Sequence, residues 1–257
     1  MGMNGRNDYG VSEAIGFILI LGIVIGSIGL VTLYGYPLLI KEQTNTDIRN
    51  MERTMIVLQN DIKSLCYKNV PYKETSLQVS GGTLSALGAV DGDVSAPRFN
   101  ITTSTGYDSG EVYLGQLKYA SSAGDAVISV SNGAVLKRQE GQQGSVMLAE
   151  PRWFYDNITK TFMIYLINLT TNEAMAQTGV GAVRMGLVET ETQINESAMT
   201  VTVKYNPGTS DDYSTAWRNY LTGSVGMTET APGSNTYTLG GVDTLVIKEY
   251  LIKVHGV

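Results

Sequence analysis

The sequence predicts an α+β chain that is mainly β, with a long transmembrane and amphipathic helix at the N-terminus and an antiparallel β-sandwich-like ectodomain after it. Two observations predict this fold class. Uncharged, mostly apolar residues fill positions 14–40, and apolar side chains then recur at helical spacing as far as Lys68. From Tyr72 onward the apolar period changes to two, which is typical of strands.

The uncharged stretch at 14–40 exceeds the ~20 residues that a helix needs to cross a bilayer core of ~30 Å. Tyr34 and Tyr36 carry the amphipathic rings that favour the headgroup boundary, and Pro37 follows where a kink costs least. We therefore place the hydrocarbon part of this span between Ala14 and about Gly35.

Gly22 and Gly26 form a G-x-x-x-G pair inside this span. In lipid, glycines at this spacing let the backbones of two helices approach closely. Glycine is also common in membrane helices generally. The sequence alone leaves both interpretations open.

The next segment predicts an amphipathic helix from Asn45 to Lys68, ending before Pro71. Its apolar residues recur three and four positions apart: Ile48, Met51, Met55, Leu58, Ile62 and Leu65. Because a coiled coil needs more than about three heptads, we expect this stripe to pack on the protein's own β domain.

The remaining chain predicts eight strands that are rich in Val, Ile, Thr and Tyr. They are 75–80, 110–120, 126–138, 144–149, 161–169, 180–188, 199–205 and 244–254. Asn132-Gly133 divides the third of these into a hairpin. Only residues 213–221 suggest a further, short helix.

Composition excludes several functions. The net charge is −6, so a basic surface for nucleic acid is not expected. One Cys and one His rule out an intramolecular disulfide and a Cys/His zinc cluster. We expect Cys66 to be a buried free thiol and His255 to lie on the surface. Together these features favour a protein that is not an enzyme.

Paired carboxylates remain as candidates for acid–base chemistry, although acidic turns are usually solvated. The pairs are Asp91 and Asp93, Glu189 and Glu191, and Asp211 and Asp212. The 91–93 and 206–212 segments also offer oxygen ligands for calcium, but neither has EF-hand spacing. We therefore expect no cofactor and no metal site, with calcium as the alternative.

Four N-x-S/T sequons are candidate N-glycosylation sites, and modification of any of them would place the β domain outside the cell. Their asparagines are Asn100, Asn157, Asn168 and Asn195. A chain rich in Asn, Ser and Thr also contains such triplets by chance.

Residues 10–41 resemble the class III signal segment of archaeal type IV pilin-like proteins. The similarity rests on Gly10 followed by the Ser-Glu-Ala-Ile-Gly-Phe run at 12–17, and on the Tyr-Gly-Tyr-Pro run at 34–37. It implies that a prepilin-type peptidase cuts between Gly10 and Val11 and that the retained helix packs into a filament core. Glu13 then either pairs with a neighbour's new amino terminus, as the resemblance implies, or stabilises the N-terminal end of its own helix through the helix dipole.

From these patterns we expect a leader at 1–10, a transmembrane and amphipathic helix at 11–69, and a β-rich extracellular domain at 70–257. The expected function is that of a pilin-like structural subunit, major or minor, of a cell-surface filament or related assembly. Its partners would be the membrane, the peptidase and further pilin-like subunits. The alternative is a solitary membrane-anchored surface protein whose β domain binds a ligand or a partner.

Overall fold

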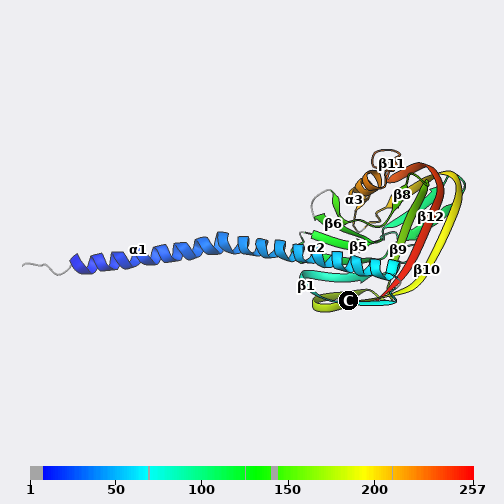
Figure 1. The fold of residues 1–257 in the computed structure, drawn as a ribbon. Helices are drawn as coiled ribbons and strands as arrows, with labels where there is room; N and C mark the ends of the chain where they lie inside the picture. Colours follow the sequence, from blue (N-terminus) through cyan, green and yellow to red (C-terminus); the bar gives the residue numbers. More distant parts are fainter. Residues whose placement is uncertain (1–7, 69, 125, 140–143, 210) are drawn as a thin grey trace, which may run out of the picture. The chain divides into compact units, whose positions relative to one another are not determined.

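The computed structural model describes residues 8–68, 70–124, 126–139, 144–209 and 211–257, with side chains from Ala14 onward except Ala198 (Figure 1). The chain forms two compact units, of which the first ends at Asp47 and the second spans Ile48–Val257. A long N-terminal apolar helix precedes a large β-sheet domain, so the predicted fold class is confirmed.

The N-terminal helical segment has three parts: α1 (Asp8–Leu30), the π-helical turn η1 (Val31–Gly35) and α2 (Tyr36–Lys68). In η1 the backbone N–H of Tyr36 donates to the carbonyl of Val31, five residues back. Pro37 has no N–H to offer to the carbonyl of Leu33, which accounts for a wider turn at this point. The helix continues through Pro37 and ends at Lys68, before Pro71 as predicted.

The apolar stripe of α2 packs on the protein's own β domain, as predicted. All six stripe residues are buried, together with Gln59 and Cys66. The polar flanks of α2 also contact strands. Lys137 Nζ lies 2.7 Å from Glu52 Oε1, and Lys73 Nζ lies 3.5 Å from Asp61 Oδ1.

The described residues of the β domain form one hydrogen-bonded sheet of twelve strands. They are β1 (Tyr72–Leu87), β2 (Arg98–Thr103), β3 (Asp108–Tyr113), β4 (Gln116–Ser121), β5 (Ala126–Ser131), β6 (Ala134–Gln139), β7 (Ser145–Ala149), β8 (Phe154–Asp156), β9 (Thr161–Thr170), β10 (Met175–Asn206), β11 (Thr228–Glu229) and β12 (Thr236–Gly256). Along the main path the order is β7-β6-β5-β4-β1-β10-β12-β9-β8, while β2 joins β10 and β3, and β11 joins β12.

Strand β10 organises this sheet. One side of β10 pairs with β12, and the other side pairs first with β1 and then with β2. Register shifts interrupt the β10–β12 ladder at four points, and such bulges bend a strand. The strands therefore curve around one core while remaining a single sheet. All pairs are antiparallel except β9 and β12, which run parallel.

Several predicted strand boundaries were wrong. Residues 180–188 and 199–205 belong to the one strand β10. The predicted strand 110–120 divides into β3 and β4, because at Gly115 the backbone turns against Leu169, whose carbonyl oxygen would overlap any Cβ there. Strands β2, β8 and β11 were not predicted.

Two local predictions are confirmed. Asn132 and Gly133 both have positive φ, 49° and 70°, as the tight turn between β5 and β6 requires. The Asn132 side chain also accepts a hydrogen bond of 2.8 Å from the backbone N–H of Ile167. The short helix predicted at 213–221 is α3 (Ser214–Asn219), followed by the π-helical turn η2 (Tyr220–Ser224).

Helix α3 is held by an aromatic cluster at its contact with the sheet. The ring of Trp217 lies 4.8 Å from that of Phe99 and 5.9 Å from that of Trp153, measured between centroids. The indole N–H of Trp153 donates to the carbonyl of Tyr165 at 2.7 Å, so its buried polar atom is satisfied.

Candidate functional site

The first candidate site is the surface of α1. Phe17, Ile18, Leu19 and Ile20 point in four directions around the helix, and each is 62–67% exposed. A helix within residues 14–68 is long and apolar enough to cross a membrane. Exposing so much apolar surface to water is unfavourable. The surface of α1 is therefore suited to burial in lipid or against another apolar helix.

The predicted contact glycines lie on this exposed helix. Successive helical residues are 100° apart, so Gly22, Gly26 and Gly29 share one face of α1. A Cβ placed on any of the three would meet no atom within 4 Å. The face is therefore open in the single chain, and a second helix could reach the backbone of α1 there.

The predicted cleavage and assembly residues fall at the start of α1. Gly10, Val11 and Glu13 lie within the helix, which begins at Asp8, but the side chains of residues 8–13 are outside the described part. Most of the predicted leader, residues 1–7, is also outside it. Cleavage after Gly10 would make Glu13 the third residue of the mature helix.

The four sequon asparagines occupy different environments. Asn157 is exposed in the turn between β8 and β9. Asn195 is half-buried in β10 opposite Leu245. Asn100 lies in β2, where its amide donates to Asp108 at 2.8 Å and to the carbonyl of Gly110 at 3.0 Å. Asn168 lies in β9, and its side-chain oxygen is buried with no hydrogen-bond partner among the described residues.

Several carboxylates of the acidic pairs that the sequence suggested make hydrogen bonds or ion pairs within the protein. Asp93 accepts hydrogen bonds from the backbone and the hydroxyl of Ser95. Asp211 is only 7% exposed and binds two cations, Lys118 at 2.5 Å and Arg138 at 3.5 Å. Asp212 accepts from the backbone N–H of Ser214 at the start of α3. Because its two oxygens already face cations, Asp211 is poorly suited to calcium.

Glu189 and Glu191 lie on β10 beside Glu249 of β12. Burial, and then the nearby Glu191 carboxylate, raise the pKa of Glu249. Within the described residues, no group of three His, Cys, Asp or Glu side chains is arranged to hold a metal ion.

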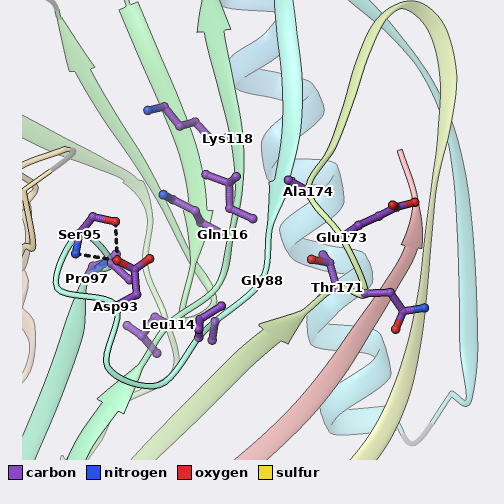
Figure 2. A pocket seen from close by; sticks show the side chains of 15 residues that line it. Gly88, Asp93, Ser95, Pro97, Leu114, Gln116, Lys118, Thr171, Glu173 and Ala174 are labelled. Carbon is purple, nitrogen blue, oxygen red and sulfur yellow. Dashed lines mark hydrogen bonds between the residues drawn. The ribbon is translucent and has the colours of Figure 1, made fainter.

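The second candidate site is a cleft of about 340 Å³ in the β domain (Figure 2). No sequence motif predicted this cleft, although Asp93, which lines it, belongs to one of the candidate acidic pairs. Figure 2 shows the loop with Asp93 and Ser95 on one side and the turn with Thr171 and Glu173 on the other. Gln116 of β4 lies between them.

Two polar side chains that line this cleft already have hydrogen-bond or ion-pair partners within the protein. Gln116 accepts from the Ser129 hydroxyl at 2.7 Å, and Lys118 is held by Asp211. The 88–97 loop is fixed at its start, where Ala89 N–H donates to the carbonyl of Leu169 at 2.9 Å.

Cys66 and His255 are the side chains best suited to nucleophilic chemistry, and they lie in different surroundings. Cys66 is buried, and desolvation raises the pKa of its thiol to about 12, so the thiolate is scarce near neutral pH. His255 is exposed near the end of β12, with its ring 6.3 Å from that of Tyr72. Both placements agree with the sequence prediction.

A protein-family model matches residues 10–255 of the chain; its description is a family of unknown function, DUF7289. This range includes α2, all of α1 but its first two residues, and every strand of the described sheet, except for the last residue of β12. No curated protein and no solved structure matches the chain.

Proposed function

Since the chain belongs to the DUF7289 family, whose model spans the helix and the β domain alike, we propose one function for both parts. The protein is a pilin-like structural subunit, major or minor, of an archaeal cell-surface filament or a related assembly. The proposal rests on the class III signal-like segment at 10–41 and on the exposed apolar helix within it.

The apolar surface of α1 is the observation that carries this proposal. Burying one large apolar side chain contributes roughly 1.5–3 kcal/mol, and α1 presents such side chains on every side. Lipid covers them in a membrane-inserted subunit, and the helices of neighbouring subunits cover them in a filament. In this proposal the same apolar surface anchors the subunit in the membrane before assembly and packs against neighbouring helices in the filament.

The proposal assigns roles to the predicted residues. A prepilin-type peptidase removes residues 1–10 by cutting between Gly10 and Val11. Glu13 lies at the new N-terminal end of the helix, and Gly22 and Gly26 lie where neighbouring helices meet. The β domain is displayed outside the cell, and the subunit's partners are the membrane and further pilin-like subunits.

Two measurements on the native protein test this proposal. N-terminal sequencing and intact mass should show a mature chain that starts at Val11. Electron microscopy of cells with and without the gene should show a filament that is lost or altered in the deletion strain. A native protein that starts at Met1, together with unchanged filaments, would refute the assignment.

The cleft of Figure 2 favours a second candidate, a solitary membrane-anchored surface protein whose β domain binds a ligand or a partner. This alternative predicts a membrane-bound protein that forms no filament and in which Gly22 and Gly26 are dispensable. Under both proposals the protein is not an enzyme and does not bind nucleic acid, in keeping with its charge of −6.

A further inference from the structure

We propose that Asn157 is an N-glycosylation site and that it is the preferred acceptor among the four sequons. This inference rests on the proposed function in one respect, because it requires the β domain to lie on the outer side of the membrane.

The Asn157 sequon occupies an exposed turn. Residues 157–160 connect β8 to β9, and β8 is the last strand on the main path of the sheet. Asn157 is exposed, and the side chain of Ile158 is 93% exposed. Within the described residues the amide of Asn157 has no side-chain hydrogen bond, so no native contact must break before it reacts.

The hydroxyl that a sequon needs two positions later is accessible as well. Thr159 is exposed, and its Oγ1 lies 3.0 Å from Asp156 Oδ2 and 3.0 Å from Thr161 Oγ1. Such exposed hydrogen bonds compete with water and add little to stability. Thr159 can therefore turn toward a transferase without disturbing the sheet.

The other three asparagines lie inside ladders. Asn100 is in β2 between β10 and β3, and two hydrogen bonds hold its amide. Asn168 in β9 pairs with Leu251, and its side-chain oxygen is buried. Asn195 in β10 is half-buried. A transferase that must surround its acceptor peptide would have to pull these strands out of the sheet.

The reaction needs a lipid-phosphate-linked oligosaccharide as donor and an oligosaccharyltransferase as catalyst. The bond between the anomeric carbon of the first sugar and the phosphate oxygen breaks, and a bond from that carbon to Nδ2 of Asn157 forms. Nδ2 loses one proton, and the lipid phosphate leaves with the bonding electron pair. No oxidant or reductant takes part.

The sequence makes the site simple to assay, because trypsin separates the four sequons. Cleavage after Arg152 and Lys160 releases the peptide 153–160, in which Asn157 is the only sequon asparagine. Asn100, Asn168 and Asn195 fall in the peptides 99–118, 161–184 and 185–204. Mass spectrometry of full-length protein purified from its own cells should find a glycan on the peptide 153–160.

Substitutions test whether the glycan depends on the sequon residues themselves or only on the exposed turn that carries them. Asn157→Gln and Thr159→Ala should abolish the glycan, whereas Thr159→Ser should keep it because the hydroxyl remains. Asn195→Gln is the matched control and should leave the glycan on 153–160 unchanged. An unmodified peptide 153–160, or glycans on the peptide 161–184 or 185–204 in its place, would overturn the inference.

A second readout distinguishes this failure from failure of the proposed function. Lys160 is about half exposed beside the site, so a membrane-impermeant amine reagent should label it in intact cells. Labelling without a glycan overturns only the acceptor assignment. Absence of labelling in intact cells, with labelling after lysis, places the β domain inside and overturns both.

Discussion

Replacing Gln59 with Met should destabilise the β domain by more than the same replacement at an exposed position of α2. Gln59 is 1% exposed, and its Nε2 donates to the carbonyl of Gly133 at 2.6 Å and to that of Glu150 at 3.0 Å. Methionine keeps the length and the helix propensity of the side chain but cannot donate. The substitution therefore removes the two hydrogen bonds and little else.

The two carbonyls differ in what they lose. Glu150 keeps a second donor, Lys63 Nζ at 3.2 Å, and its bond to Gln59 is only partly buried, so its loss costs about 0.5–1 kcal/mol. The bond to Gly133 is buried, and losing it costs about 1–3 kcal/mol. Together we expect a loss of about 1.5–4 kcal/mol in the free energy of unfolding.

Denaturant unfolding of the full chain in detergent micelles measures this loss. Both tryptophans of the chain, Trp153 and Trp217, are buried in the β domain, so intrinsic fluorescence reports on that domain alone. The exposed neighbour Asn60 gives the control Asn60→Met, which should change the free energy of unfolding by less than about 0.5 kcal/mol. If Gln59→Met is as mild as this control, the hydrogen bonds do not hold α2 in place.

Three further predictions concern maturation, assembly and pH. Gly10→Leu should block removal of the leader, seen as an intact mass that retains residues 1–10; a normally processed chain would contradict the cleavage assignment. Replacing Gly22 and Gly26 together with Leu should reduce filament yield while leaving the protein in the membrane fraction, and unchanged filaments would exclude a contact through these glycines. Because burial raises the pKa of Glu249, the contribution of this residue to the stability of the native state falls as the pH rises above about 4.3, the ordinary value for glutamate. Glu249→Gln should therefore raise the melting temperature near pH 7 and leave it unchanged near pH 3; an equal shift at both pH values would contradict this cause.

The sequence predicted those parts of the fold that depend on local pattern. The stripe from Ile48 to Leu65 determines which face of α2 is buried, and Asn132-Gly133 determines the turn between β5 and β6, because only residues that tolerate positive φ fit there. Pairing between distant segments was not predictable. The parallel β9–β12 pair and the length of β10 depend on partners far away in the chain.

The candidate sites also include some features that the local sequence predicts and others that depend on contacts between distant segments. The apolar helix and the sequons are readable in the sequence because each is a continuous motif. Which sequon is accessible depends on the sheet, as the contrast between Asn157 and Asn168 shows. The cleft brings the 88–97 loop to the 171–174 turn, and no periodicity or motif in either segment signals the other.

The position of β12 between β10 and β9 governs when the domain is able to fold. Ribosomes synthesise β12 after every other strand of the described sheet, and each paired residue of β12 lies 83 positions after its partner in β9, as Thr244 does after Thr161. Until β12 emerges, the apolar edges of β9 and β10 have no permanent neighbour, and such long-range closure is slow. A truncation before residue 236 would therefore leave these edges of β9 and β10 unpaired, and unpaired strand edges promote aggregation.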